Sequence, residues 1–233
     1  MATLYDAYGR PIDTALLKQE LSGPTITGVR TAFSAHPAQN CTPERLGRLL
    51  LSAEEGDAEG YLELAEEIEE KDLHYRSVLS TRKLQVSGLD LTVEAATDSS
   101  EDLKTADLVR DFLDQDIVQP ALFDLLDAIG KGYAVCEILW DTQGRQWFPS
   151  CIEWRDPRWF GFEAWEGHTL KLRNAAGFLE DLAPAKYIRH IHKSKSGIPL
   201  RGGLARAASW GYLFKNFDLK AWVLFCEVYG HPL

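Results

Sequence analysis

The sequence is poor in cysteine, and its four cysteines are not arranged as a metal site or a disulfide framework. They are widely scattered and include no C-x-x-C pair: Cys41, Cys136, Cys151 and Cys226. Zinc sites use closely spaced cysteine pairs, and disulfide frameworks belong to small proteins of oxidising compartments. We therefore expect neither feature, and we expect the protein to be made in a reducing cytoplasm.

Basic residues are also scarce, because 25 Lys and Arg stand against 35 Asp and Glu, which gives a formal net charge of −10. A surface that binds duplex DNA usually clusters Lys and Arg against the phosphates. The charge balance excludes a simple duplex-binding surface. Any contact with DNA is expected to be local or non-adhesive.

A long uninterrupted apolar run is missing as well. The N-terminus has no charged segment followed by an apolar one, and the most apolar stretch, residues 204–229, contains five charged residues: Arg206, Lys215, Asp218, Lys220 and Glu227. A membrane-spanning helix needs roughly 20 consecutive apolar residues. We therefore expect a soluble chain without a membrane partner.

Catalytic motifs are absent too: the sequence has no H-E-x-x-H, G-x-S-x-G or G-x-x-x-x-G-K-[ST], and Gly130-Lys131-Gly132 is too short to cradle phosphates. His190 and His192 share one face of a predicted strand and could ligate a metal, but no third ligand is near in the sequence. Glu137 lies in an apolar run and is expected either to point to a sheet edge or to pair with a basic residue. We predict a non-enzyme without cofactors, with a metal-dependent hydrolase using His190 and His192 as a weak alternative.

The first part of the chain reads as an arm followed by helices. Residues 1–41 are rich in Gly, Pro, Thr and Ala, which indicates an extended arm with a short helix near 14–21, expected to pack on a neighbour. Thr42-Pro43-Glu44 is typical of a helix start. Apolar spacing predicts helices at 43–53, 58–86, 100–113 and 121–129, and alternation predicts a strand at 89–95.

The second part reads as strands followed by one helix. Residues 133–140, YAVCEILW, are typical of a strand covered on both faces. Turn signals at intervals of about 10 residues then separate short strands near 147–154, 159–163, 169–173 and 187–192, an antiparallel meander. A loop at 193–203 leads to a helix at 204–229 with a broad aromatic face. The predicted fold is α+β: an arm (1–41), then one domain (42–233) with a helical part (42–130), a mixed sheet with a β-meander (131–192), and a loop and C-terminal aromatic packing helix (193–233).

The seven tryptophans suggest a second alternative. Trp147, Trp154, Trp159 and Trp165 fall in the predicted meander, next to Arg155 and Arg158. Aromatic rings with nearby Arg can stack on unpaired bases. A single-stranded nucleic-acid binding module that uses this Trp-rich meander is therefore kept as an alternative, against the simpler interpretation of an aromatic sheet core.

Five segments, in order, resemble the Mu-like phage portal family. They are ERLGRLLLSAEEGD at 44–57, EEKDLHYRSVLSTRKLQVSGL at 69–89, AIGKGYAVCEILWD at 128–141, EWRDPRWFGF at 153–162 and GIPLRGGLARAASWGYLFKNFDLKAWVLFCEVYGHPL at 197–233. The resemblance covers most of the chain after about residue 40. It implies that the α+β domain corresponds to a portal wing, and that the chain is incomplete at its C-terminal end, since family members continue beyond the aromatic helix.

The resemblance further implies a function. A protein of this family is a virion structural subunit, made in the bacterial host cytoplasm, that forms a homo-oligomeric ring of about twelve copies at a capsid vertex. The ring is the head-tail connector that conducts double-stranded DNA during packaging and ejection without sequence specificity. Its implied partners are terminase, capsid and neck or tail proteins.

Particular residues are candidates for these contacts. A long helix that carries long polar side chains could span two subunits, and an aromatic helix needs a partner. These two features give six candidates for the subunit interface: Tyr75, Arg76, Arg82, Lys83, Trp222 and Tyr229. A small basic loop supplies three residues expected near DNA: Lys193, Lys195 and Arg201.

Overall fold

A computed structural model describes residues 3–6, 8–26, 28–143, 146–163 and 167–230. Its strands form two separate three-stranded sheets, ordered β2-β1-β6 and β3-β4-β5, in which every pairing is antiparallel. The bounds are β1 Tyr133–Gln143, β2 Gln146–Arg155, β3 Phe160–Phe162, β4 Leu170–Arg173, β5 Leu179–Asp181 and β6 Tyr187–Ile191.

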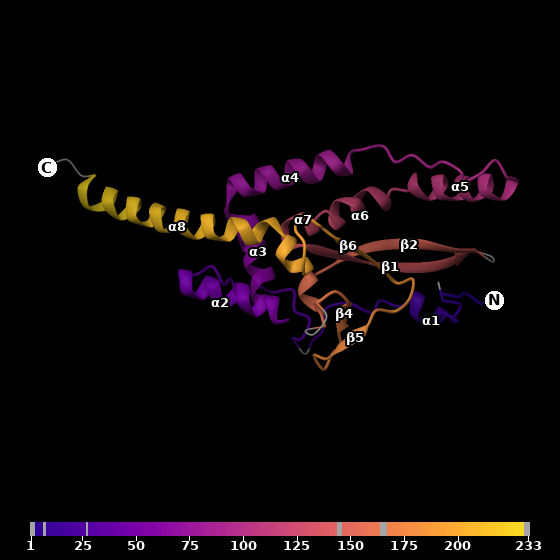
Figure 1. The fold of residues 1–233 in the computed structure, drawn as a ribbon, viewed down its shortest axis with the longest axis horizontal. Helices are drawn as coiled ribbons and strands as arrows, with labels where there is room; N and C mark the ends of the chain where they lie inside the picture. The colour runs from indigo at the N-terminus through magenta and orange to yellow at the C-terminus, as the bar shows by residue number, and fades with distance from the viewer. Residues whose placement is uncertain (1–2, 7, 27, 144–145, 164–166, 231–233) are drawn as a thin grey trace.

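The helices surround these sheets in an elongated molecule. Figure 1 shows α8 leaving one end of the body, whereas α5 and the paired strands β1 and β2 extend towards the other end. The bounds are α1 Thr14–Leu17, α2 Pro43–Glu54, α3 Glu59–Lys71, α4 Leu73–Ser87, α5 Ser100–Leu113, α6 Val118–Leu125, α7 Ala128–Lys131, α8 Leu204–Tyr229, and the 3₁₀ turns η1 Pro157–Trp159 and η2 Pro199–Gly202.

The α+β class is confirmed, but the prediction of one mixed sheet is wrong. After the β3-β4-β5 meander, β6 returns to pair with β1 and does not extend the meander. The short strand β5 was not predicted, since its residues alternate only weakly. The sequence pattern locates strands but carries little information on which strand each one pairs with.

The predicted single helix at 58–86 is also wrong, because the chain turns at Asp72 and forms α3 and α4. The Asp72 backbone is extended, and its carboxylate accepts hydrogen bonds from the backbone N–H groups of His74 (3.0 Å) and Tyr75 (3.1 Å). An aspartate in this position satisfies the free N–H groups at the start of a helix. α3 therefore lies in the core while α4 runs across it.

Two further elements differ from the prediction. Residues 89–95 form no strand, because none of the described strands lies beside them to complete a ladder, and the predicted helix at 121–129 is divided into α6 and α7. By contrast, the helices predicted at 43–53, 100–113 and 204–229 are confirmed by α2, α5 and α8.

The N-terminal arm packs on its own chain. The Glu137 carboxylate of β1 accepts hydrogen bonds from the backbone N–H groups of Leu21 (2.6 Å) and Ser22 (3.1 Å). Lys186 donates from Nζ to the Leu17 carbonyl oxygen at 2.9 Å, and Arg30 donates from Nη1 to the Arg173 carbonyl oxygen at 2.8 Å. The arm was expected on a neighbour, but these contacts satisfy its backbone within the subunit.

The core forms where α3 packs against both sheets and the base of α8. Tyr61, Leu62 and Ile68 of α3 are fully buried together with Tyr133 of β1 and Phe160 of β3. Burying side chains of this size stabilises a fold by roughly 2 kcal/mol each. The core therefore fixes the first turns of α8 and the charged face of α3, the two features described next.

Candidate functional site

Helix α8 is buried only in its first part. Ala205, Ser209, Tyr212 and Leu213 pack into the body, whereas every residue from 214 to 230 is exposed. Figure 1 shows the exposed part of α8 extending beyond the other elements. Nine large apolar side chains lie along it: Phe214, Phe217, Leu219, Trp222, Val223, Leu224, Phe225, Val228 and Tyr229. We call residues 214–229 the free half of α8.

Charged contacts hold the base of α8 in place. Arg206 forms an ion pair with Glu54 and donates to the Leu50 carbonyl oxygen at 3.2 Å, which ties α8 to α2. Lys215 lies 3.1 Å from Asp72, the residue that caps α4. Gly203 precedes the helix at a point where a Cβ atom would collide with the Gly130 carbonyl oxygen and the Lys131 backbone. The direction in which the free half leaves the body is therefore fixed by the fold.

The apolar character of the free half is typical of a surface that becomes buried. A helix with apolar residues on all sides is normally buried, and a large exposed apolar patch marks an interaction surface. A cavity of about 150 Å³ adjoins it, lined by Cys41, Leu46, Leu64, Tyr212 and Phe217 among others. This arrangement can bind another protein surface through hydrophobic burial.

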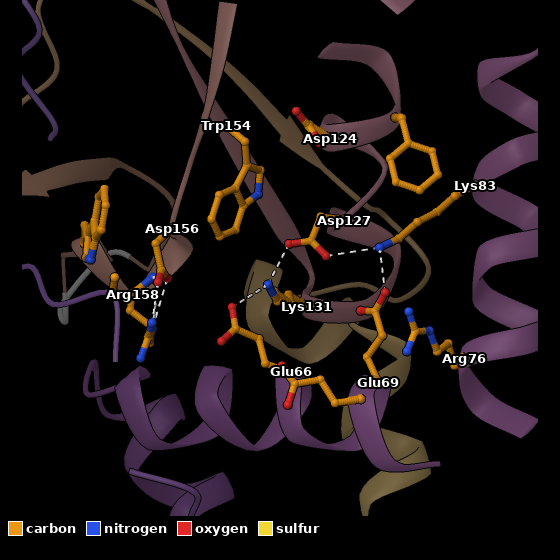
Figure 2. Close-up of a pocket in the computed structure, with 14 residues that line it drawn as sticks. Glu66, Glu69, Arg76, Lys83, Asp124, Asp127, Lys131, Trp154, Asp156 and Arg158 are labelled. Atoms are coloured by element: carbon orange, nitrogen blue, oxygen red, sulfur yellow. Dashed lines mark hydrogen bonds and ion pairs between the residues drawn. The ribbon is translucent and has the colours of Figure 1, made fainter. Parts of the chain in front are cut away.

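A second feature is a charged pocket of about 490 Å³ on the face of α3 (Figure 2). Lys131 of α7 lies 2.7 Å from Asp127 and 3.0 Å from Glu66 of α3. Lys83 of α4 lies 3.2 Å from Asp127 and 3.1 Å from Glu69 of α3. The two lysines thus share Asp127 and connect three helices through one network.

The same pocket continues to β2 and η1. The Arg158 guanidinium lies 2.5 Å from Asp156 and 3.2 Å from Glu63, and Lys131 Nζ lies 5.3 Å from the centre of the Trp154 ring. Burial alone would raise the pKa of Asp127, but the ammonium groups of Lys131 and Lys83 outweigh burial and hold that pKa below its ordinary value. The basic side chains therefore offset the acidic ones within the subunit.

The pocket offers little chemistry for catalysis. Its lining residues do not include a Ser, Cys or His that could act as a nucleophile, and its lysines are engaged in ion pairs. In the described ranges no group of three or more His, Cys, Asp and Glu could hold a metal ion. Burial, followed by the nearby Asp127, raises the pKa of Asp124, which has no basic partner at ion-pair distance among the described residues. The network is best suited to holding helices together.

The four α4 residues proposed for a subunit interface do not act as one group. Tyr75 and Arg76 line or adjoin the charged pocket, and Arg82 is exposed. Lys83 is only 5 % exposed, and its ammonium group is engaged by Glu69 and Asp127 of its own chain. Helical spacing placed Lys83 on a polar face but could not show that α3 and α7 cover it.

The other candidates lie on the surface. Trp222 and Tyr229 belong to the free half of α8 and are each 72 % exposed. Lys193 and Lys195 are exposed in the loop after β6, and Arg201 lies 3.5 Å from Glu54. Their roles at a subunit interface or near DNA remain predictions.

The geometry does not support the stacking alternative. Trp159 is buried, Trp154 faces Lys131, and Trp147 packs under Lys18, whose Nζ lies 5.5 Å from the ring centre. Trp165 lies outside the described residues. Arg155 is buried against Glu137 at 2.9 Å, and Arg158 is buried in the charged pocket. Neither arginine is free to contact phosphates.

The metal alternative has no support either. His190 lies on β6, and His192 comes directly after the last residue of that strand. Burial, with the nearby His192, lowers the pKa of His190. The two imidazoles still lack a third ligand within the described part of the chain. Two histidines alone do not make up the three or four protein ligands of a typical zinc site.

The charged pocket itself was missed by the sequence analysis. A partial signal was present in α3, which carries Glu63, Glu66, Glu67, Glu69 and Glu70 within eight residues, but their spacing did not show that the fold buries Glu63 and Glu67. Buried carboxylates require basic partners. Those partners come from α4, α7 and η1, which only the fold brings together.

No helix among the described residues is long and apolar enough to cross a membrane.

Comparison with known proteins identifies the relatives of this chain. The sequence model of the family described as "Portal protein of Mu bacteriophage" matches residues 62–233. The chain is 34 % identical over 235 residues to the portal protein of Escherichia phage Mu, covering 100 % of this chain and 46 % of that protein. It is 31 % identical over 234 residues to the Mu-like prophage FluMu protein gp29 of Haemophilus influenzae, covering 99 % and 45 %. The chain spans about half the length of these curated relatives.

Proposed function

Because the chain belongs to the family of Mu phage portal proteins, we propose that it is a structural subunit of a portal ring at a capsid vertex of a phage or prophage particle. In this role it forms part of the conduit for DNA packaging and ejection. The ring binds terminase during packaging and binds neck or tail proteins afterwards. The subunit itself carries out no catalysis.

The observation that carries this proposal at the level of structure is the free half of α8. Nine large apolar side chains lie on one exposed helix whose direction is fixed by the body. Each apolar side chain that becomes buried in an interface adds roughly 1.5–3 kcal/mol of favourable transfer free energy. A ring subunit that buries this helix against a second copy would recover that free energy, with Trp222 and Tyr229 in the contact.

The charge of the chain fits passage of DNA. The net charge of −10 repels phosphate, and the basic groups of the charged pocket are already paired. Each phosphate contact would add affinity and slow the movement of DNA. The exposed Lys193 and Lys195 and the partly exposed Arg201 are the positions that we propose lie nearest to passing DNA.

Assembly of the purified protein tests the proposal. Mass photometry and negative-stain electron microscopy should show oligomers with a central hole. Trp222→Glu places a charge in the free half of α8 and is expected to shift the population at least about tenfold towards monomer, since a buried unpaired charge costs several kcal/mol.

Phe178→Glu is the matched control, because Phe178 is equally exposed (71 %) but lies in the turn between β4 and β5. This variant should assemble like the parent protein. A parent chain that stays monomeric at high concentration, or equal assembly of the Trp222→Glu and parent proteins, would contradict the proposed role of α8.

A further inference from the structure

The segment that joins α4 to α6 forms a projection at the end of the molecule opposite α8 (Figure 1). It comprises residues 88–117 and contains α5; we call it the acidic finger. Ala106 is the one buried residue of α5. Arg110 donates from Nη2 to the Val93 carbonyl oxygen at 2.7 Å, and Gln119 donates to the Ser87 carbonyl oxygen at 2.6 Å. These contacts hold the finger in a defined shape although most of its surface is exposed.

The acidic finger carries most of the net charge of the chain. It contains nine Asp and Glu against two Lys and Arg, so it accounts for seven of the ten net negative charges. Eight of the nine carboxylates are exposed, and within the described residues only Asp107 has an ion-pair partner, Arg110. The nine are Asp90, Glu94, Asp98, Glu101, Asp102, Asp107, Asp111, Asp114 and Asp116.

A cleft of about 490 Å³ lies at the base of the finger. Its apolar lining comes from both sides of the finger and from α6: Leu89, Leu91, Leu113, Val118 and Leu122. Asp90, Asp114 and Asp116 also line it, together with Ser87, Gln115 and Gln119, and the lining contains no basic residue. The charged pocket on α3 differs, because four basic side chains there offset its carboxylates.

The lining of the cleft is mainly polar, but two leucines at the cleft leave apolar surface exposed. Leu89 is 63 % exposed and Leu91 is 49 % exposed, and Leu108 of α5 is also exposed. The alternation that predicted a strand at 89–95 thus places two leucines beside the cleft without a neighbouring strand to cover them. An apolar surface of this kind, surrounded by charge of one sign, fits a ligand with an apolar anchor and the opposite charge.

We propose that the acidic finger is a docking surface for a basic amphipathic segment of a partner protein. Leucine-type side chains of that segment would enter the cleft, and its Lys and Arg would face Asp90, Asp114 and Asp116. Nucleic acid does not fit, because its phosphates would be repelled by the same carboxylates. A metal ion does not fit either, since no group of three suitable ligands exists among the described residues.

A pair of labelled peptides tests the docking surface on the intact chain. One peptide is an amphipathic helix of about 18 residues built from Leu and Lys, and the other has Glu in place of Lys. Fluorescence anisotropy should show binding of the Lys peptide but not of the Glu peptide, and raising the salt concentration should weaken the binding. The triple variant D90N/D114N/D116N should bind the Lys peptide about tenfold more weakly, since each charge contributes roughly a factor of two to three.

Two further proteins make the result specific. The control E44Q/E55Q/D57N removes the same number of exposed charges from α2 and the turn after it and should bind like the parent chain. Leu91→Gln keeps the charge but removes an apolar contact and should weaken binding several-fold.

Equal binding of the Lys peptide to the triple variant and the parent would overturn the proposal, as would equal loss in the α2 control. Displacement of the peptide by spermidine at equal charge would also overturn it, because the apolar anchor would then be irrelevant.

Discussion

Lys131 is the residue on which the charged pocket depends most. It is only 4 % exposed and lies between Asp127 of its own turn and Glu66 of α3, and the neighbouring carboxylates raise its pKa despite its burial. An ion pair of this kind is costly to bury but still more costly to break, because the remaining partner is left charged and unsolvated. The network therefore makes α3, α4 and α7 dependent on one side chain.

Replacing Lys131 with Met should lower the free energy of unfolding by about 3–5 kcal/mol, since Asp127 and Glu66 then lose their shared partner. Urea denaturation followed by circular dichroism measures this change. Arg48→Met is the control, because Arg48 and Glu44 form an exposed pair at 3.9 Å on α2 and its loss should be nearly neutral. Equal stability of the Lys131→Met and parent proteins would show that the pocket does not hold the helices together.

At the scale of elements, the sequence predicted what depends on local chemistry and missed what depends on distant contacts. The Thr42-Pro43 start of α2 was found because the cap is made within one turn, where Thr42 Oγ1 accepts from the Arg45 N–H at 3.2 Å. Asp72 was missed, although it caps α4, because the apolar spacing continues through it. The pairing of β6 with β1 depends on residues about 50 positions apart, which spacing rules do not reach.

The candidate site divides in the same way. The aromatic helix that carries Trp222 and Tyr229 could be predicted from the sequence, and both side chains are exposed in the fold, whereas their role at an interface stays a prediction. Lys83 could not be placed, since its environment consists of side chains from α3 and from the turn before α7. Of the two environments expected for Glu137, the structure shows the basic partner, Arg155. Its second role, as the anchor of the N-terminal arm, depends on residues more than 100 positions away.

The arm should detach when Glu137 loses its charge. Burial would raise the pKa of Glu137, but hydrogen bonds from Leu21 and Ser22 and the charge of Arg155 hold it below the ordinary value of 4.5. A carboxyl group with a lowered pKa in the folded state stabilises the protein above its ordinary pKa, and this contribution is lost as the pH falls through the folded value. We expect arm anchoring to be intact at pH 7 and to be lost only as the pH falls through the lowered pKa of Glu137, below the ordinary value.

Glu137→Gln should reproduce the acid state at neutral pH. Trypsin should then cleave at Arg30 at pH 7, where the parent chain protects it, and the free energy of unfolding should fall by about 3 kcal/mol and depend less on pH. Glu153→Gln is the control, because Glu153 lies opposite Glu137 on β2 and also pairs with Arg155, at 3.3 Å, but is exposed. A protected arm in the Glu137→Gln variant would mean that the other arm contacts, such as Lys186 to Leu17, suffice.

For the molecule as a whole, the two proposed surfaces lie at opposite ends and differ in chemistry. The free half of α8 is mainly apolar, whereas the acidic finger combines exposed leucines beside a mainly polar cleft with a strongly negative surface. Between them lies the core, with the charged pocket that fixes the helices leading to each end. Surfaces so far apart, with no shared partner, are expected to act independently.

Independence can be measured with variants already defined. Trp222→Glu should impair assembly but leave the affinity for the Leu/Lys peptide within about twofold of the parent value, and D90N/D114N/D116N should do the reverse. The combined variant should show both losses, each of the same size as in the separate variants. If Trp222→Glu also weakened peptide binding, the peptide would be bound at a contact that assembly creates, and the finger would then be one side of an interface between subunits.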